Sequence, residues 1–433
     1  MASTNPARGT RDFLPADVRK REYVIGIIKE VYESYGFEPL ETPAFENLET
    51  LTGKYGEEGG QLMFKILKRG EKLRQETGSS AQASGLADLA LRYDLTVPLA
   101  RVVANHRNEL PKFFKRYQIQ PVWRADRPAR GRYREFYQCD VDAIGSTSEL
   151  VEVELISAAA KIFDRLGFSD YVFRLNDRRR LSEMVLAAGI GPTLETDAMV
   201  ALDKLDKIGK DGVLNELIER GISPDAAKRF LAFASDSEAA PQSDSLAKIV
   251  DLLSMDIAVK DDPSLARGLS YYTGMIVEVN VPDLPGSLAG GGRYDELIGM
   301  FGKEQIPACG ISLGLERILV VMDERGMFPP EIADSTAADV LVTILSEETA
   351  PESLKLAAEL RERGIRVSLY PEADKLGKQM KYADAIRVPF VCVLGENEIA
   401  EGKVTLKNMR TGEQTQASTP DAAASIRDAN KGV

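Results

Sequence analysis

The sequence predicts a mixed α and β protein of several domains: a core of helices and strands, a helical insertion within that core, and a separate C-terminal α/β domain. Three observations support this prediction. The chain has 433 residues, too many for one hydrophobic core, so we expect about two to four domains. From Gly191 onward the sequence loses its strand-forming residues. Further along, the linker-like "MFPPEIADSTAA" precedes a regular alternation of strands and helices.

Composition and the distribution of apolar residues indicate the class of protein and its cellular compartment. The chain is 44% hydrophobic and 28% charged, which is typical of a soluble globular protein. The N-terminus has no apolar run like that of a signal peptide, and no segment approaches the roughly 20 apolar residues of a membrane span. We therefore expect a cytoplasmic protein without a membrane partner. A formal net charge of -12 argues against nonspecific coating of nucleic acid, although a local basic surface can still bind phosphate.

Cysteine and histidine are too sparse for several kinds of chemistry. Cys139, Cys309 and Cys392 are isolated, without CxxC spacing, so neither a disulfide framework nor a zinc site is indicated. The single histidine, His106, nearly excludes histidine-based triads and metal sites. Catalysis must therefore rest on carboxylates, arginines and tyrosines.

The elements of the first half follow from periodicity. Apolar residues of 16–36 fall on one helical face, with Gly36 as the stop: Val24, Ile27, Ile28, Val31 and Tyr35. Pro39 and Pro43 suit an edge strand or interface segment over 37–45, and an ordinary surface strand fits equally well. Strands are expected at 61–67 and 89–96, joined by a mobile loop over 74–88. A helix over 149–167 and a strand over 171–177 come next, before the helical insertion.

Strand patterns return after the insertion, over 270–281 and 308–315, the latter running into a helix over 316–326. Beyond the linker, strands are predicted at 339–345, 365–370, 389–395 and 403–409, with helices at 351–364 and 375–385. This alternation predicts the small separate α/β domain.

The stretch "RADRPARGRYREFYQCD" concentrates positive charge in an acidic chain. Phosphate binding needs planar, permanently charged, bidentate donors, which arginine supplies. Aromatic neighbours add faces on which a nucleobase can stack. Taken alone, such a run is more often a solvated or salt-bridged hairpin than a phosphate site. The residues are Arg124, Arg127, Arg130, Arg132 and Arg134, with Tyr133, Phe136 and Tyr137.

Three further stretches combine glycine or tyrosine with arginine. "GGGRYDELIG" and "ACGISLGLERIL" place bare backbone beside Arg293 and Arg317, and "LARGLSYYTG" adds Arg267. Glycines allow close approach of a ligand but also occur in plain turns, and neither a P-loop nor a dinucleotide-binding fingerprint is present. Arg267 is equally compatible with one buried ion pair in a core strand.

Taken together, the motifs resemble a known family. "ALRYDLTVPLAR", "VWRADRPARGRYREFYQCDVDAIG", "LARGLSYYTG", "GGGRYDELIG" and "CGISLGLER", in this order and spacing, resemble the histidyl-tRNA synthetase family. With "RGTRDFLP" and the tail, the resemblance covers essentially the whole chain. It implies a class II synthetase core, an antiparallel sheet with flanking helices, over 1–190 and 256–328. It also implies a helical insertion domain over 191–255 and an anticodon-binding α/β domain over 337–433.

The resemblance also implies an activity and partners. A histidyl-tRNA synthetase activates L-histidine with ATP and transfers it to tRNA(His), as a homodimer in which Pro43 would lie at the interface. Arg124 would meet the α-phosphate and Arg132 the outer phosphates, while Phe136 and Arg317 would flank adenine. Mg²⁺ would arrive with ATP, without a protein cage of metal ligands.

Histidine recognition is implied residue by residue. Asp94, Thr96 and Gln138 would accept hydrogen bonds from the ammonium, as a cation requires. The imidazole would lie between Asp142 and Tyr272, beside Tyr271, in a pocket that rejects apolar side chains. Arg267, with Arg124, would stabilise charge at the α-phosphate.

One position departs from the family pattern, and two alternatives stay open. Ser270 stands where the family usually has Asp, so any contact of that charge is in doubt. Lys375, Lys378 and Lys381 would face the anticodon loop, or form a solvated helix face. A noncatalytic histidine-sensing regulatory subunit of a histidine-biosynthesis enzyme is one rival; a class II synthetase for proline, glycine or threonine is the other.

Overall fold

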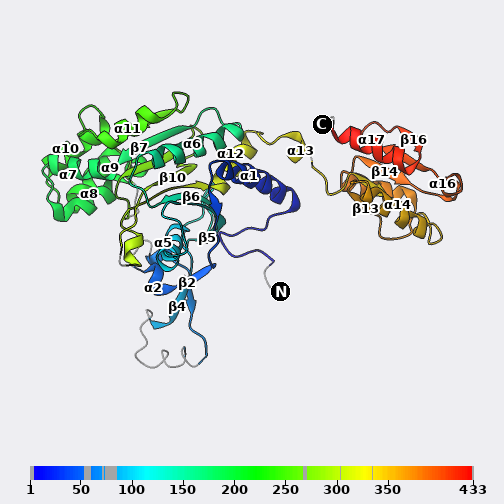
Figure 1. The fold of residues 1–433 in the computed structure, drawn as a ribbon, viewed down its shortest axis with the longest axis horizontal. Helices are drawn as coiled ribbons and strands as arrows, with labels where there is room; N and C mark the ends of the chain where they lie inside the picture. Colours follow the sequence, from blue (N-terminus) through cyan, green and yellow to red (C-terminus); the bar gives the residue numbers. More distant parts are fainter. Residues whose placement is uncertain are drawn as a thin grey trace. The chain divides into compact units, whose positions relative to one another are not determined.

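A computed structural model describes residues 4–52, 60–70, 73, 85–266, 271–302, 304–333 and 335–431. The chain divides into two compact units, Met1–Met327 and Phe328–Val433 (Figure 1). Each unit has its own β-sheet and buried core. Within the described ranges, every helix is too short or too polar to span a bilayer.

The first unit is built on an eight-stranded sheet of order β1-β5-β6-β11-β10-β9-β7-β8. All neighbouring pairs run antiparallel except the two at the edges, β1 with β5 and β7 with β8. This confirms the predicted antiparallel core. The strands are β1 (Glu38–Pro39), β5 (Phe114–Trp123), β6 (Glu135–Ile144), β7 (Val172–Asp177), β8 (Val259–Asp261), β9 (Met275–Asn280), β10 (Ala289–Arg293) and β11 (Ala308–Gly314).

Three helices cover one face of this sheet: α1 (Pro15–Ser34), α6 (Leu150–Arg165) and α12 (Leu315–Glu324) (Figure 1). The predicted face of α1 is confirmed at Val24, Ile28 and Val31, which are buried. The helix ends where predicted, because Gly36 takes a left-handed φ of 76° that other residues rarely adopt. Pro39 lies in an edge strand, as its missing N–H requires.

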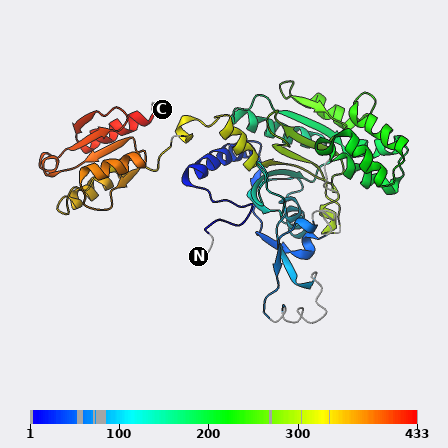
Figure 2. The same cartoon turned by 180° about the vertical axis from the view of Figure 1, so that it is seen from behind.

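The other elements of this unit surround the sheet (Figure 2). A three-stranded sheet, β2 (Phe45–Asn47), β4 (Ala87–Leu91) and β3 (Lys65–Leu67), lies with α2 (Leu48–Leu51) and α5 (Thr96–Asn105). After α7 (Arg178–Ala187), residues 192–252 contain helices only: η2 (Pro192–Leu194), α8 (Glu195–Leu202), α9 (Leu205–Glu219), α10 (Pro224–Ser235) and α11 (Asp244–Leu252). The loop predicted between the β3 and β4 segments lies mostly outside the described residues.

The second unit carries a five-stranded sheet of order β13-β12-β14-β15-β16. Its predicted alternation is confirmed in β12 (Val340–Val342), α14 (Ala350–Glu362), β13 (Val367–Leu369), α15 (Leu376–Ala385), β14 (Phe390–Val393) and β15 (Val404–Asn408). The pattern missed α16 (Glu396–Glu401), β16 (Gln414–Ala417) and α17 (Thr419–Lys431). The predicted linker contains a short helix, α13 (Pro330–Ala333), because proline at a first helical position has its φ already set.

Candidate active site

The site residues gather on the sheet face opposite α1, α6 and α12. Strand register places Arg116 of β5, Asp142 of β6, Gly310 of β11 and Gly292 of β10 in one row across the sheet. The row two residues along contains Gln118, Asp140, Ser312 and Gly290. The polar side chains therefore come from β5 and β6, with Ser312 from β11, while the glycines of β10 and β11 present bare backbone.

Asp142 is held by two partners within this face. Arg116 Nη2 lies 2.8 Å from Asp142 Oδ2, and both side chains are almost completely buried. The Tyr294 hydroxyl donates a hydrogen bond to Oδ1. Burial raises the pKa of Asp142, and the positive charge of Arg116 opposes that shift. A methyl group on Gly310 would lie 2.0 Å from Oδ1, so only glycine leaves room for this carboxylate.

Asp140 and Gln138 lie beside this pair. Gln138 Nε2 donates to Ser312 Oγ at 2.9 Å. Gln138 Oε1 is buried and accepts no hydrogen bond from the described residues, so an acceptor is available for a donor such as an ammonium. Burial raises the pKa of Asp140 to about 7, while Arg116 opposes the shift.

Tyrosines and the start of α5 border the same face. The Tyr271 and Tyr272 rings lie 5.1 Å apart, and a methyl on Gly292 would lie 2.9 Å from Tyr272 Cδ1. Tyr271 shares a hydrogen bond with Thr96 and is close enough to Asp94 for their charges to interact. Asp94 accepts from the Val97 backbone N–H at 3.1 Å. The structure therefore brings the predicted histidine ligands to one region.

Residues 124–134, here called the arginine hairpin, connect β5 to β6. Arg124 Nε donates to the Tyr93 carbonyl at 3.0 Å. Its guanidinium carbon lies 4.3 Å from the Tyr93 ring centroid and 5.3 Å from that of Phe136. Arg132 is 47% exposed and donates to Asp126 at 2.7 Å. Arg124 is thus fixed beside an aromatic face, whereas Arg132 is partnered but open to solvent.

Arg317, at the start of α12, reaches the hairpin from the other side. Its Nη1 donates to the Ser287 carbonyl at 2.7 Å. Methyl groups on Gly131 and Gly286 would lie 3.1 and 2.6 Å from its side chain, so both glycines give it space. The adjacent Glu316 is buried and accepts from the Tyr137 N–H at 3.1 and 3.0 Å. Burial raises its pKa to about 7.

Two arginines of the sequence motifs have structural partners. Arg293 forms two bonds of 2.6 and 2.7 Å with the buried Glu152. It lies on the helix-covered side of the sheet, away from the row that contains Asp142. Arg130 pairs with Glu324 and donates to the Asp283 carbonyl at 3.0 Å. The salt-bridged interpretation of the hairpin is correct at this residue.

Some site residues were not found from sequence, and some lie outside the described part. Arg267 and Ser270 fall in 267–270, outside the described residues. Sequence reasoning missed Arg116, Asp140, Tyr294, Ser312 and Glu316. Asp140 offered a signal, since it alternates with Gln138 and Asp142 in β6.

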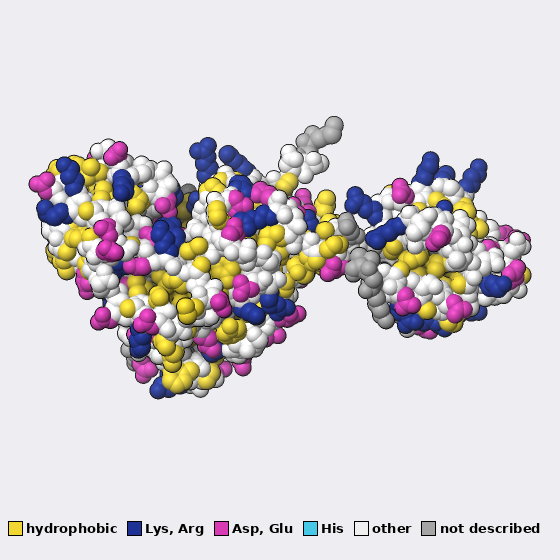
Figure 3. Space-filling view, turned by 90° about the horizontal axis from the view of Figure 1, so that it is seen from above, with side chains coloured by type: hydrophobic (Ala, Val, Ile, Leu, Met, Phe, Trp, Pro, Cys, Tyr) yellow, Lys and Arg dark blue, Asp and Glu magenta, His cyan; other side chains and the backbone are white. Residues whose placement is uncertain are grey.

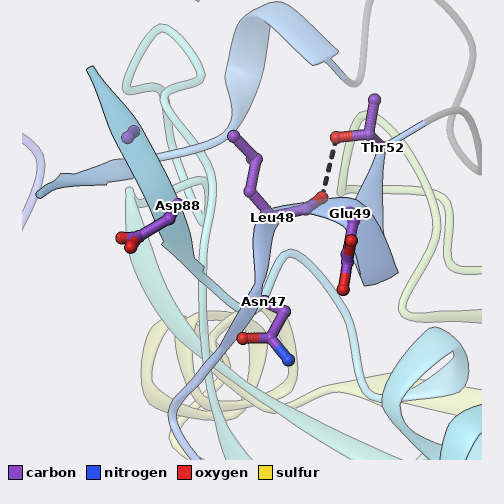
Figure 4. A pocket seen from close by; sticks show the side chains of 6 residues that line it. Asn47, Leu48, Glu49, Thr52 and Asp88 are labelled. Atoms are coloured by element: carbon purple, nitrogen blue, oxygen red, sulfur yellow. Dashed lines mark hydrogen bonds between the residues drawn. The ribbon is translucent and has the colours of Figure 1, made fainter. Parts of the chain in front are cut away.

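A cavity of about 390 Å³ lies elsewhere, against β2, α2 and β4. Figure 4 shows Asn47, Glu49 and Asp88 around it, with Thr52 Oγ1 donating to the Leu48 carbonyl at 2.7 Å. It contains no predicted site residue, and its carboxylates are unsuited to phosphate. Within the described part of the chain, no group of three or more His, Cys, Asp or Glu side chains is placed to hold a metal ion.

Comparisons with known proteins identify the family. A family profile described as histidyl-tRNA synthetase matches residues 9–318, and one described as an anticodon binding domain matches residues 339–428. The histidine–tRNA ligase of Porphyromonas gingivalis is 46% identical, over 98% of this chain and 99% of that protein. That of Christiangramia forsetii is 43% identical, over 94% of this chain and 96% of its own.

Solved structures are similar as well. The crystal structure of histidyl-tRNA synthetase from a Nostoc species covers 99% of this chain, with a TM-score of 0.79 and 31% identity. A Bacillus halodurans structure titled as an ATP phosphoribosyltransferase regulatory subunit/histidyl-tRNA synthetase has a TM-score of 0.73 at 21% identity. The second similarity concerns the fold alone.

Proposed function

The chain belongs to the histidyl-tRNA synthetase family, and we propose that the polar face of its eight-stranded sheet carries the ligase reaction. The enzyme activates histidine with ATP to histidyl-adenylate and transfers the histidyl group to tRNA(His). The observation that carries the site assignment is the convergence of Gln138, Asp140 and Asp142 with glycine-lined backbone beside the arginine hairpin.

We assign ATP to the arginine hairpin and the start of α12. Arg124 is assigned to the α-phosphate from the family resemblance. Its guanidinium is already fixed by Tyr93, so it is in position before ATP binds. Arg132 leaves Asp126 and binds the outer phosphates, as its exposure permits. Phe136 and Arg317 flank the adenine, where an aromatic face and a planar cation both stack.

We assign histidine to the rows beside Asp142. Asp94, Thr96 and Gln138 accept from the ammonium, and Gln138 Oε1 offers a buried acceptor for it. The imidazole lies between Asp142 and Tyr272, with Tyr271 as the next wall of the pocket. Because Asp142 is fixed by Arg116 and Tyr294, its position is set before histidine arrives.

The chemistry needs positioning and charge stabilisation. A histidine carboxylate oxygen attacks the α-phosphorus, the bond to the β-phosphate breaks and diphosphate leaves. The histidyl group then passes to a ribose hydroxyl of the tRNA, and AMP leaves. Arg124 stabilises the charge that develops on the α-phosphate, a contribution worth about 2.7–4 kcal/mol for comparable donors. The matching role of Arg267 remains a prediction from the sequence.

Mg²⁺ is proposed as the divalent ion that accompanies ATP. The carboxylates at the arginine hairpin, Asp126 and Glu324, are paired with Arg132 and Arg130, so the nucleotide's own phosphates would supply the ligands. When bound, the ion neutralises charge on the outer phosphates.

The C-terminal unit is the proposed contact for the anticodon loop. In α15, Lys378 is 69% exposed and pairs with Asp374, and Lys375 and Lys381 share this helix region. The Tyr370 and Tyr382 rings lie 5.5 Å apart, and Tyr382 is 40% exposed. An exposed aromatic ring beside lysines suits single-stranded RNA, whose bases stack and whose phosphates attract cations. Figure 3 shows Lys and Arg mixed with acidic side chains on this unit.

Three further expectations complete the proposal. The enzyme is a cytoplasmic homodimer, and Pro43, next to the exposed Phe45 of β2, lies at the dimer interface. The core comprises 1–190 and 256–328, the insertion 191–255 and the anticodon-binding domain 337–433.

ATP–diphosphate exchange with each of the twenty amino acids tests the assignment. We expect exchange with histidine only, and a loss of about 100-fold or more in kcat/KM for Arg124→Ala. Arg165→Ala is the matched control, because Arg165 pairs with Glu30 on the helix-covered side. Absence of exchange would favour a histidine-sensing subunit, and normal kinetics of Arg124→Ala would reject the site.

A further inference from the structure

The arginine hairpin extends beyond the sheet and needs support of its own. The hairpin has one internal bridge, between Ala129 and Arg132. Among the described residues, it pairs with no other strand. Yet the hairpin must present Arg124 and Arg132 at fixed positions. The support on one side is the segment Arg8–Phe13, here called the N-terminal segment, which comes from the motif "RGTRDFLP" to which the reaction assigns no role.

Backbone contacts tie the N-terminal segment to the hairpin. The Arg134 N–H donates to the Gly9 carbonyl at 2.7 Å. Gly9 has a φ of 86°, and a methyl group there would lie 2.8 Å from the Arg134 side chain. The N-terminal segment and the arginine hairpin therefore lie so close together at this point that only glycine fits.

Arg11 adds a stacked layer to this contact. Its guanidinium carbon lies over both rings, 4.4 Å from the Phe13 centroid and 4.1 Å from that of Tyr133. Its Nη1 donates to the Tyr133 hydroxyl at 3.1 Å. Two other guanidinium nitrogens, Nε and Nη2, are buried and donate to no described residue. Ring contacts and one hydrogen bond thus hold a partly buried cation here.

A second stack continues the first. Arg21 of α1 lies 4.7 Å from the Phe13 ring and 5.1 Å from the Tyr137 ring. In β6, Tyr137 alternates with Phe136 and Gln138, so this layer lies behind the residues assigned to ATP and histidine. The Tyr137 N–H also donates to Glu316, which precedes Arg317.

We propose that Arg11 is a positioning residue for ATP. By stacking on Phe13 and Tyr133, its side chain fixes the arginine hairpin from the side away from the proposed ATP site. The proposal rests on the assignment of ATP to the hairpin. Arg11 itself touches no reacting atom. Without it the hairpin samples more conformations, and the nucleotide must select the competent one, which weakens its apparent affinity.

Exchange kinetics of Arg11→Ala test the proposal. We expect the KM for ATP to rise about tenfold, with the KM for histidine within about twofold of the wild-type value. Arg11→Lys keeps the charge but loses the planar stack, so its KM for ATP should lie between those of the wild type and Arg11→Ala. Tyr133→Phe keeps the ring and loses only the hydroxyl acceptor, so its effect should be smaller. Arg11→Ala and Tyr133→Leu should combine less than additively in the KM for ATP.

Two controls separate the possible failures. Arg165→Ala removes an arginine that contacts α1 but not the hairpin, and should leave the KM for ATP unchanged. If Arg124→Ala lowers kcat/KM for ATP and Arg11→Ala does not raise the KM for ATP, the positioning role is wrong while the ATP site stands. If neither variant changes kcat/KM for ATP, the ATP site itself is wrong. Equal rises for ATP and histidine in Arg11→Ala would indicate general destabilisation and would also overturn the proposal.

Discussion

The two faces of the eight-stranded sheet are made by alternate residues of the same strands. On one face β6 presents Cys139 and Val141, and on the other Gln138, Asp140 and Asp142. Both faces are buried, since the three polar residues expose only 8%, 2% and 2% of their surface. Burial of apolar groups stabilises a fold, whereas burial of charged groups costs free energy unless they are paired. The cost of burying this polar face is consistent with the function we propose for it, whereas the apolar face contributes to stability.

The largest effect should come from leaving a buried charge unpaired. Arg116→Met removes the positive charge that is paired with Asp142. We expect the free energy of unfolding to fall by about 3–5 kcal/mol. Adding Asp142→Leu and Tyr294→Phe removes the polar groups that were paired around position 142, and should restore part of that stability while histidine activation stays lost; Asp140 still lacks the charge of Arg116. Denaturant unfolding measures the difference through Trp123, the only tryptophan, which lies in β5 of the same unit.

This comparison fails in either of two ways. Unchanged stability of Arg116→Met would mean that the pair is not buried as described. Histidine-dependent exchange by the triple variant would mean that the polar face is not needed for function.

A smaller effect should follow from filling the space beside Asp142. Gly310→Ala places a methyl 2.0 Å from its Oδ1, and Arg116 and Tyr294 leave the carboxylate little freedom to move away. We expect the KM for histidine to rise roughly 100-fold, equivalent to about 2.7 kcal/mol. Gly26→Ala in α1 is the control, because its methyl would meet no atom within 4 Å. Exchange kinetics showing equal KM values in the two variants would contradict the assignment.

The smallest effects distinguish two adjacent residues of β11. Ile311→Val, on the helix-covered face, should cost about 0.5–1.5 kcal/mol in stability and leave the kinetics unchanged. Ser312→Ala, on the polar face, removes the acceptor of the Gln138 amide and should raise the KM for histidine severalfold, as for a bond of about 1 kcal/mol. If both variants change stability alone, the division between the faces does not hold at β11.

Much of the fold was predictable because its signals are local. The period of α1, the left-handed position at Gly36 and the edge location of Pro39 each depend on a few adjacent residues. The C-terminal elements missed by the pattern are short or polar, such as β16 with its sequence QTQA, and carry little hydrophobic period. The site residues that were found came from motifs matched as a set, and their roles remain proposals.

The sequence by itself determined the local elements, the family and the concentration of arginines between β5 and β6. Only the tertiary structure decided which arginines lie on the polar face of the sheet and which have partners elsewhere. Arg293 turned toward Glu152, and Arg116, outside every motif stretch that combines arginine with glycine or tyrosine, became the partner of Asp142. Alternation of residues along a strand predicts which side chains share a face of the sheet. It does not predict that the polar face is also buried. That depends on Leu95, whose carbonyl accepts from Arg116, and on Tyr294, which donates to Asp142; neither is adjacent to β6 in the chain.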